Sequence, residues 1–357
     1  MDKSTSESIK KLLEESGLVS SKKAIHNQKF KSDFTNQTIL ITGAAGSIGS
    51  EISKQIANGT FKNLILIDNA ESPMYFLQKE FEQFSNLNIN FIISDVRDVF
   101  SMQEIFESFK PDIVFHTAAY KHVPLMESNP YEAVKLNILA TKLLADLALL
   151  NKTKKFVFIS TDKAVNPISV MGMTKRICER FLEDLNTKNN TKFFITRFGN
   201  ILGSNGSLIP LFKKQIELGK PLTITSSKIS RYFINKTKAC NLILKIASYE
   251  YWEHNMFTFN MGEPIKIIDL AKTYIASQND ISEDNISFEF IGLRSGEKLH
   301  EEIISKFEML KNTIFDDIMY VIQKNNKTSN PIDLKLLESI SPHQKTSEIK
   351  SILKNYL

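Results

Sequence analysis

Cysteine is scarce in this sequence, and long apolar runs are missing. The 357 residues include two cysteines, Cys178 and Cys240, which lie far apart in segments predicted as helices. Their spacing argues against a disulfide framework and favours a reducing compartment, and because neither belongs to a metal-ligand spacing, we expect no metal. The N-terminus has no apolar stretch as long as a signal peptide or a membrane span. We therefore expect no membrane span, and a chain that begins near Met1 and stays in the cytoplasm.

A block of basic residues interleaved with aromatic residues is also missing. Lys and Arg number 45 against 40 Asp and Glu, a net charge of +5, but the lysines are dispersed. This spread is typical of a solvated surface and argues against nucleic acid as a partner, although a basic cleft for a pyrophosphate would use such charge equally well. With 42% hydrophobic and 24% charged residues, the composition indicates an ordinary soluble globular protein.

From residue 37, short apolar runs alternate with longer periodic stretches. This alternation predicts strand-helix-strand units, and hence an α/β fold: a Rossmann-type doubly wound parallel sheet with a smaller C-terminal substrate-binding lobe. The expected strands are Thr38–Thr42, Asn63–Asp68, Asn90–Ser94, Ile113–His116, Lys155–Ser160 and Phe193–Arg197. The expected helices are Ser50–Ala57, Pro73–Phe84, Ser101–Ser108, Pro130–Leu150 and Val170–Leu185.

The rhythm of the sequence predicts four parts. Residues 1–36 form an N-terminal extension with a short amphipathic piece that could fold on a neighbour. Residues 37–200 form the NAD-binding Rossmann domain, and 201–325 form mainly the substrate lobe, some of whose elements could return to the main sheet. Residues 326–357 are a polar C-terminal tail.

A glycine-rich loop follows the first expected strand. Its sequence, TGAAGSIG from Thr42 to Gly49, has the spacing Gly-x-x-Gly-x-x-Gly and opens a helix. Glycines permit the tight turn and the close approach of backbone to a pyrophosphate, whose charge the helix N-terminus stabilises. Three glycines alone are a weak signal, but between a strand and a helix they predict a dinucleotide site. The expected contacts are Gly43, Ala45, Gly46, Ser47 and Ile48.

Acidic residues follow the second and third strands. Asp68 is placed to accept hydrogen bonds from the adenosine ribose, with Asn69 beside it, and its carboxylate would repel a 2′-phosphate, so NAD is favoured over NADP. The alternative is a helix-capping aspartate without a ligand. Asp95 and Val96 fit an adenine-edge position, and a capping turn explains them equally well.

The loop after the fourth strand lies at the carboxyl edge of the sheet, where ligands bind. Ala118 and Ala119 are small enough to let a cofactor pass, and Lys121 and His122 would face a substrate or its phosphates. His122 could equally be a surface loop histidine. Asn137, in the following helix, could hold the site through its amide or be a buried amide without a part in the chemistry.

The Tyr-x-x-x-Lys pair of short-chain oxidoreductases is incomplete, because Met171 stands four residues before Lys175. Methionine cannot take a proton, so either the chain is inactive or another group moves the proton. Thr161 can hydrogen-bond a substrate hydroxyl, Asp162 can act as an acid, and Lys163 as a base if burial and nearby cations lower its pKa. Lys175 would hold the nicotinamide ribose. The alternative for this segment is a polar loop before a helix.

Several long motifs together resemble a known family. STDKAVNP, MGMTK, HTAAYKHVPLME, TRFGNILGSNGSLIPLF, RYFI and GLRSGEKLHEE are similar to the UDP-N-acetylglucosamine 4,6-dehydratases of bacterial polysaccharide and glycan biosynthesis, in the extended short-chain dehydrogenase/reductase superfamily. The resemblance covers about residues 37 to 310. The TGAAGSIG loop and Met171 look like the branch that retains configuration at carbon 5, because the inverting branch resembles TGGTGSFG.

The resemblance implies an internal redox cycle on UDP-N-acetylglucosamine. A hydride leaves carbon 4 for NAD, water is eliminated across carbons 5 and 6, and the hydride returns to carbon 6, giving UDP-2-acetamido-2,6-dideoxy-4-hexulose. Asp162 would help the carbon 6 hydroxyl leave, and Lys163 would take the carbon 5 proton.

The same resemblance suggests residues for the UDP moiety. The expected residues are Arg197, Asn200, Arg231, Arg294 and Glu297. Arginines give bidentate contacts to pyrophosphate oxygens, although each residue singly could be part of a surface ion pair. We also expect a homo-oligomer.

Three other functions remain open: a UDP-sugar 4-epimerase, a 5-inverting dehydratase and a catalytically silent NAD-binding protein. Lys163 beside Asp162 favours elimination, because epimerisation requires no base at carbon 5.

Overall fold

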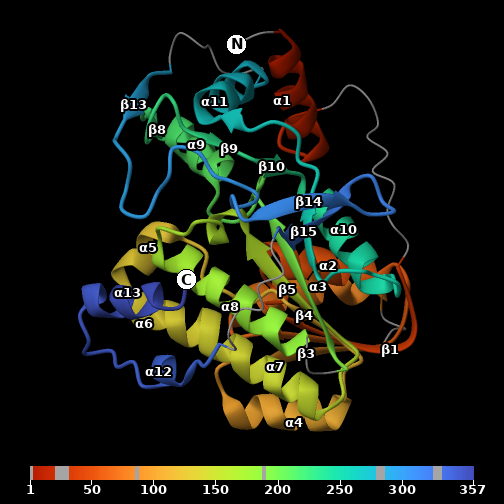
Figure 1. The fold of residues 1–357 in the computed structure, drawn as a ribbon. Helices are drawn as coiled ribbons and strands as arrows, with labels where there is room; N and C mark the ends of the chain where they lie inside the picture. Colours follow the sequence, from red (N-terminus) through yellow and green to blue (C-terminus); the bar gives the residue numbers. More distant parts are fainter. Residues whose placement is uncertain (1–2, 21–31, 85–87, 187–189, 279–285, 325–331) are drawn as a thin grey trace.

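A nine-stranded sheet forms the centre of the protein (Figure 1). The computed structural model describes residues 3–20, 32–84, 88–186, 190–278, 286–324 and 332–357. The strand order is β14-β15-β11-β6-β5-β4-β1-β2-β3. The bounds are β1 Asp33–Thr42, β2 Thr60–Asp68, β3 Ile89–Ile93, β4 Ile113–His116, β5 Lys155–Thr161, β6 Lys192–Phe198, β11 Met256–Phe259, β14 Glu308–Asn312 and β15 Ile318–Gln323.

The strands from β3 to β11 are parallel, and β15 and β14 extend the sheet antiparallel. Parallel strands are covered on both faces, so their sequences are continuous apolar runs rather than alternating ones. In β1 the segment from Thr38 to Thr42 is wholly buried, as expected for such a strand. The order reverses between β1 and β4, which is the topological switch point of a Rossmann sheet.

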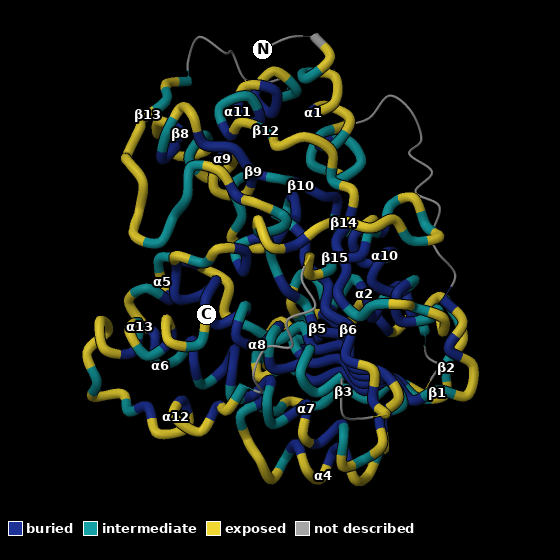
Figure 2. Tube along the Cα trace, viewed as in Figure 1, coloured by how far each residue is buried: buried dark blue, intermediate teal, exposed yellow. Residues whose placement is uncertain are grey.

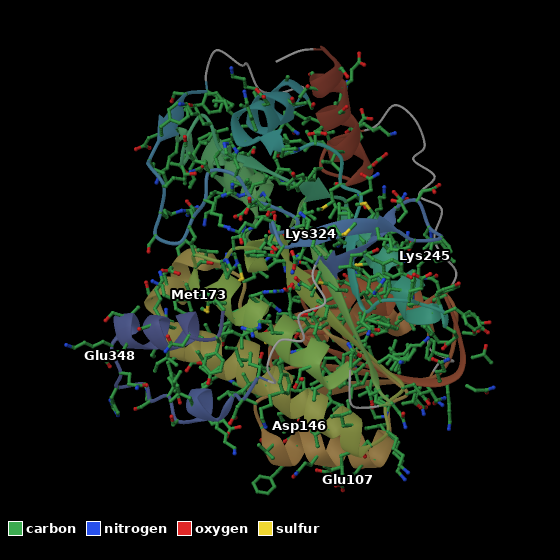
Figure 3. All side chains as sticks on the ribbon, in the orientation of Figure 1. Glu107, Asp146, Met173, Lys245, Lys324 and Glu348 are labelled. Atoms are coloured by element: carbon green, nitrogen blue, oxygen red, sulfur yellow. The ribbon has the colours of Figure 1, made fainter. Side chains whose placement is uncertain are left out.

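Helices cover both faces of the sheet and define two cores. One face carries α2 (Ser47–Ala57), α3 (Glu71–Glu80) and α10 (Lys236–Ser248). The other face carries α4 (Val99–Phe109), α7 (Ala140–Leu150) and α8 (Val170–Asn186). We call the core beneath α4, α7 and α8 the first core, and the core beneath α2, α3 and α10 the second core. The buried sheet is dark in Figure 2. Figure 3 labels the buried Met173 of α8, the exposed Asp146 of α7 and the exposed Glu107 of α4, which lies at the lower edge of the protein.

A smaller lobe lies beyond the carboxyl ends of the strands. Three two-stranded ladders and three helices surround a third core. The strands are β7 Asn200–Ile201, β8 Leu222–Ile224, β9 Ser230–Arg231, β10 Phe233–Ile234, β12 Ile265–Lys266 and β13 Phe288–Phe290. The helices are α1 Lys3–Glu15, α9 Leu208–Glu217 and α11 Ile267–Ala276. Ile9 and Leu13 of α1 are fully buried in this core, so the N-terminal helix packs on the lobe of its own chain, beside α11 (Figure 1).

The predicted α/β fold is confirmed, and all six expected strands are present. The expected helix Pro130–Leu150 is interrupted: α6 (Pro130–Ala133) passes into a π-helical turn, Val134–Leu139, before α7. Strands β11, β14 and β15 fall within 201–325 but join the main sheet, so this part of the chain builds both lobes.

The C-terminal tail is also part of the fold. It contains α12 (Lys335–Glu338) and α13 (Thr346–Lys354), and Ile349 and Leu353 of α13 are buried in the first core. α13 packs against α6 and α8, close to α5 (Val123–Ser128) in Figure 1. In the described ranges, we find no helix with the length and apolar character that a membrane crossing requires.

Candidate functional site

A cavity opens at the switch point between β1 and β4, as the topology predicts. We call it the switch-point cavity. It is lined by Gly43, Gly46, Asp68, Asn69, Ser94, Asp95, Val96, Thr117, Ala118, Ala119, Tyr120 and Leu136. Most of the cofactor residues expected from the sequence are in this set. Ser94, Thr117, Tyr120 and Leu136 are additional. The first three follow the ends of β3 and β4, which could have indicated them, whereas Leu136 lies in the π-helical turn and no sequence signal indicates it.

The glycine loop requires its glycines. Gly43 has φ +67°, and a Cβ there would lie 2.7 Å from the Cα and N atoms of Ala118. A Cβ at Gly49 would lie 2.2 Å from the carbonyl oxygen of Gly43. Gly46 is the N-cap of α2 and offers no side-chain acceptor. The loop therefore presents bare backbone and the positive end of a helix to the cavity, a combination that suits an anionic pyrophosphate.

Asp68 connects the glycine loop to the end of β2. Its Oδ2 accepts a hydrogen bond from the Ala45 N–H (3.0 Å), and its Oδ1 accepts one from the Ala70 N–H (3.0 Å). The N-cap of α3 is Ala70, so Asp68 is not a simple helix cap. Its carboxylate lines the cavity, where ribose hydroxyls could donate to it.

Asp95 follows β3, where the sequence allowed an adenine-edge contact or a capping turn; the N-cap of α4 is Asp98, so Asp95 does not cap that helix. It lines the cavity, and it also accepts hydrogen bonds from Arg97, including one of 2.7 Å from Nη2. The hydrogen bonds from the Arg97 side chain lower the pKa of Asp95 despite its partial burial. Arg97 also donates to Glu132 at 2.7 Å, so the wall that Asp95 and Val96 form is braced by an ion-pair network.

Four expected cofactor residues do not line the cavity: Lys175, described below, and three residues of the glycine loop. Ala45 is held by Asp68 through its N–H, and Ile48 packs against the second core. Ser47 accepts a hydrogen bond at 3.0 Å through its Oγ from the N–H of Asn205, a residue of the loop before α9. These three loop residues stabilise the glycine loop through contacts with neighbouring protein and do not line the cavity.

Thr161, Asp162 and Lys163 form one cluster at the carboxyl end of β5. The Oδ1 atom of Asp162 accepts hydrogen bonds from Thr161 Oγ1 (2.9 Å) and Lys163 Nζ (3.0 Å). Lys163 Nζ also donates to Asn200 Oδ1 at 3.1 Å. Asp162 is fully buried, and its Oδ2 has no hydrogen-bond partner among the residues that the structure describes. The structure thus joins a carboxyl group, an amine and a hydroxyl on one rim.

Glu301 is a member of this cluster that the sequence reasoning missed. Its Oε1 lies 3.8 Å from Lys163 Nζ and 3.9 Å from Arg231 Nε. Its Oε2 is buried and lacks a partner within the described ranges. Glu301 stands in the GEKLHEE segment, but only the fold reveals that it faces Lys163, which is far away in sequence.

Lys175 lies behind the cluster. Its Nζ donates to the carbonyl oxygen of Ile159 at 2.9 Å and lies 4.4 Å from the centroid of the Phe158 ring. Burial lowers the pKa of Lys175 to about 8, against the opposing effects of Cys178 and Glu179. A buried lysine with a lowered pKa is typical of a functional site.

Met171 is part of the first core. It is 3% exposed, and its position four residues before Lys175 places it on the same side of α8. The place of the absent phenol is therefore filled by an apolar side chain.

The loop after β4 meets the loop before α9. Lys121 Nζ donates to the carbonyl oxygen of Asn205 at 2.9 Å, and a Cβ at Gly206 would lie 2.7 Å from Cε1 of His122. Burial lowers the pKa of both Lys121 and His122, and the Lys121 charge adds to the effect on His122. Two basic residues thus stand where the two loops meet.

Asn137 positions this loop rather than facing a ligand. It is fully buried in the π-helical turn. Its side chain accepts from the Tyr120 N–H (2.9 Å) and donates to the Tyr120 carbonyl (3.0 Å) and to Thr174 Oγ1 (3.0 Å). These bonds occupy both ends of the amide, so Asn137 supports the site from within the core, in line with the alternatives that the sequence left open. The amide joins the loop to α8.

Arg197 is the clearest correction. Its side chain is fully buried between Glu179 and Glu308: Nη2 donates to Glu179 Oε2 at 2.7 Å, and Nη1 donates to Glu308 Oε2 at 3.0 Å. Because both carboxylates and surrounding protein enclose the guanidinium, it cannot contact a UDP moiety here. A buried arginine requires such partners, and the sequence motif could not distinguish this role from nucleotide binding.

The other expected substrate residues divide into two groups. Asn200 and Arg231 lie at the Lys163–Glu301 cluster. Arg231 is buried and donates to the carbonyl oxygens of Ser230, Lys298 and Leu299. Arg294 and Glu297 form an ion pair with each other (2.8 Å), and the Arg294 side chain is 52% exposed. Arg294 is therefore open to a ligand, whereas Arg231 serves mainly to hold the 298–301 segment.

Over the described ranges, no three or more His, Cys, Asp or Glu residues come together in a group that could hold a metal ion.

A parallel sheet with a switch-point cavity, followed by a polar cluster at the end of β5 and a lysine on the next helix, defines a protein of the short-chain dehydrogenase/reductase type. Residues 39–323 match the family model described as polysaccharide biosynthesis protein, and the chain belongs to this family.

Relatives within this group have different named activities. The chain is 43% identical over 321 residues to the capsular polysaccharide biosynthesis protein CapD of Staphylococcus aureus, covering 89% of this chain and 53% of CapD. It is 36% identical to a UDP-glucose 4-epimerase of Rickettsia bellii (78% of this chain, 80% of the relative). It is 34% identical to the inverting UDP-N-acetylglucosamine 4,6-dehydratase of Campylobacter jejuni (76% and 78%). This chain spans about half the length of CapD.

Solved structures agree with the fold. Pen from Bacillus thuringiensis matches with a TM-score of 0.72 and 31% identity, covering 81% of this chain and 90% of Pen. DesIV, a dTDP-glucose 4,6-dehydratase from Streptomyces venezuelae solved with NAD bound, matches with a TM-score of 0.65 and 18% identity over 74% of this chain and 88% of DesIV. The second likeness shows the fold alone.

Proposed function

We propose that this chain is an NAD-dependent UDP-N-acetylglucosamine 4,6-dehydratase that retains configuration at carbon 5. The observation that carries the proposal is the Asp162–Lys163 pair, joined at 3.0 Å and hydrogen-bonded to Thr161 and Asn200 at the end of β5. Elimination of water from a sugar requires an acid at the departing hydroxyl and a base at the neighbouring carbon, and this pair supplies both.

The switch-point cavity suits NAD. Its bare glycine loop would hold the pyrophosphate, Asp68 the adenosine ribose, and Asp95 with Val96 the adenine edge. The chemistry that bound NAD supplies is reversible acceptance of a hydride from the sugar. Lys175, whose pKa burial lowers to about 8, would donate a hydrogen bond to the nicotinamide ribose.

The roles of the remaining residues follow from the cluster. Asp162 would protonate the carbon 6 oxygen as it leaves as water, and Lys163 in its amine form would take the carbon 5 proton. Thr161, which donates to Asp162 at 2.9 Å, would bind the carbon 4 hydroxyl and pass its proton towards that carboxylate. Glu301 and Asn200 hold the Lys163 amine in place at 3.8 Å and 3.1 Å.

Basic groups around the cluster suit the UDP moiety. We infer that Lys121, His122 and Arg294 contact the diphosphate, with Arg294 oriented by Glu297. Arginine gives planar bidentate contacts to phosphate oxygens. Asn200 would bond a phosphate or a uracil edge, and Arg231 would support this side of the site.

One NMR experiment tests the reaction. The chain is incubated with UDP-N-acetylglucosamine in deuterated buffer, and we expect loss of water, a new carbon 6 methyl signal and deuterium at carbon 5 on the retaining face. An intact hexose of altered configuration would reject dehydration. Deuterium on the opposite face would reject the retaining stereochemistry but keep the dehydratase.

A UDP-sugar 4-epimerase is the second candidate, because relatives with that name match over 78% of the chain. An epimerase needs no base at carbon 5, so the two functions differ in their need for Lys163. We expect Lys163→Ala to lose most of the elimination rate, with NAD binding unchanged. Dehydration that continues at the wild-type rate in this variant would overturn the mechanism.

Asp68 is the test of cofactor choice. Its carboxylate would repel a 2′-phosphate, so we expect Asp68→Asn to weaken NAD binding and to narrow the preference for NAD over NADP. The dissociation constants of both dinucleotides, measured by calorimetry, check this. Equal preference in the wild type would contradict the assignment of NAD.

A further inference from the structure

Glu127, at the end of α5, binds three segments that are far apart in the sequence. Its side chain is 10% exposed. Oε1 accepts a hydrogen bond from the Val170 N–H at 2.7 Å. Oε2 accepts hydrogen bonds from Ser295 Oγ at 3.2 Å and from Lys350 Nζ at 2.7 Å. One carboxylate therefore connects α5 with α8, with the 292–298 loop and with α13.

The three hydrogen-bond partners of Glu127 belong to three different elements of the fold. Val170 is the first residue of α8, the helix that carries Lys175. Ser295 lies next to the exposed Arg294 in the loop that runs from Gly292 to Lys298. Lys350 belongs to α13, in the C-terminal tail. The loop that carries Arg294, the helix that carries Lys175 and the C-terminal tail thus meet at Glu127.

The loop is seated directly on the carboxylate. Gly296 has φ +78°, and a Cβ there would lie 2.9 Å from Glu127 Oε1 and 2.9 Å from Ser169 Cβ. These distances leave no room for a side chain. The loop can approach the start of α8 this closely only because residue 296 is glycine.

The charges around Glu127 favour the ionised form of its carboxyl group. Burial raises the pKa of Glu127, but the hydrogen bond and charge of Lys350 and the Val170 N–H outweigh it and lower the pKa overall. The carboxylate is therefore ionised at neutral pH. It also lies at the positive end of α8, where a negative charge is stabilised.

We propose that Glu127 is a positioning residue for nucleotide-sugar binding: it fastens the loop of Arg294 and Glu297 to the start of α8, and Lys350 completes this clasp from α13. The inference rests on the proposed function, which assigns the loop to the UDP moiety. Because Glu127 reaches the substrate only through the loop, its loss weakens binding more than the chemical steps.

Three variants test the clasp. Glu127→Gln keeps the shape and the acceptor for Val170 but loses the charge that holds Lys350. Lys350→Met removes the donor from α13. Lys354→Met is the matched control, since Lys354 lies one turn further along α13 and is exposed.

We expect the KM for UDP-N-acetylglucosamine to rise about tenfold in Glu127→Gln, with kcat little changed, because hydrogen bonds to a charged group are strong enough for an effect of that size. Lys350→Met should show a smaller rise in KM, and Lys354→Met none. In the free protein, amide hydrogen exchange of residues 292–298 should become faster in the first two variants only.

These measurements distinguish a failure of the Glu127 clasp from a failure of the proposed function. If the wild type does not convert UDP-N-acetylglucosamine, the proposed function fails, and the clasp is judged by calorimetry with UDP and by the exchange rates. Unchanged exchange in both variants, or a lower unfolding temperature with unchanged KM and UDP affinity, would overturn the clasp. If Glu127→Gln does not fold, Lys350→Met decides, because the Lys350 side chain is 25% exposed.

Discussion

Replacing Arg197 by methionine tests whether this residue builds the core or binds nucleotide. In the structure its guanidinium donates to Glu179 through Nε (3.0 Å) and Nη2 (2.7 Å), and to Glu308 through Nη1 (3.0 Å). All three side chains are buried. Arg197→Met would leave two carboxylates in the interior without their principal counter-charge.

The expected cost is large. Removing one partner of a buried ion pair destabilises a protein by about 3–5 kcal/mol, out of a total stability of roughly 5–15 kcal/mol. Arg176→Met is the matched control in the same network. Arg176 also donates to Glu179, at 3.0 Å, but its side chain is 22% exposed, so solvent screening should limit the cost to about 1 kcal/mol.

The stability difference between Arg197→Met and the wild type should depend on pH. Burial raises the pKa of Glu179 and of Glu308, but Arg197 outweighs burial and lowers both. Such groups stabilise the folded state above the unfolded carboxyl pKa of about 4.3, and this contribution is lost as pH falls through their lower folded pKa. Without Arg197 the two carboxyl groups bind protons more readily. The loss of folding stability in Arg197→Met, relative to the wild type, should therefore become smaller as the pH falls from about 8 to about 5.

Urea unfolding followed by circular dichroism measures these differences, and calorimetry with UDP completes the assay. We expect Arg197→Met to unfold at much lower urea while its folded fraction binds UDP as the wild type does. A variant that unfolds like the wild type but no longer binds UDP would refute the assignment of Arg197 to the core.

Two further predictions concern the glycine loop and Glu183, a half-buried carboxyl group of α8. Gly43→Ala should weaken NAD binding at least about tenfold, because its Cβ would lie 2.7 Å from Ala118 backbone atoms. Gly17→Ala, with the same φ of +67° but nothing within 4 Å, is the control, and equal NAD affinity of the two variants would contradict the steric argument. Burial raises the pKa of Glu183 to about 7, so stability is lost as pH rises from about 4.3 to that value. Glu183→Gln should therefore have a higher unfolding temperature than the wild type at about pH 8 but not at about pH 5. A difference in unfolding temperature that does not depend on pH would contradict this prediction.

The sequence predicts six of the nine strands of the main sheet, because a parallel strand buried on both faces has a recognisable apolar run; it does not place β11, β14 and β15 in that sheet. It also predicts much of the switch-point cavity. The carboxyl ends of parallel strands share one edge, so residues directly after them, such as Gly43, Asp68 and Ala118, must come together. Local pattern and topology are sufficient for these positions.

Arg197, which was misassigned, and Glu301, which was missed, both depend on partners distant in the chain. Arg197 is held by Glu308, and Glu301 faces Lys163, across more than a hundred residues in each case. No periodicity or spacing encodes such pairs. A motif that contains an arginine therefore cannot reveal whether the side chain faces a ligand or a buried carboxylate until the fold is known.

Met171 shows how the core and the chemistry meet on α8. If Asp162 and Lys163 move the protons, residue 171 needs only to fill space, and its 3% exposure within the first core agrees. Met171→Leu nearly conserves volume, so it should cost less than about 1.5 kcal/mol and keep its turnover, whereas Met171→Tyr should lose about 1–3 kcal/mol by overpacking and gain no activity. Product formation by NMR and urea unfolding check both variants. If Met171→Leu is folded but inactive, or if Met171→Tyr is faster than the wild type, position 171 takes part in the chemistry and the Asp162–Lys163 pair is not sufficient.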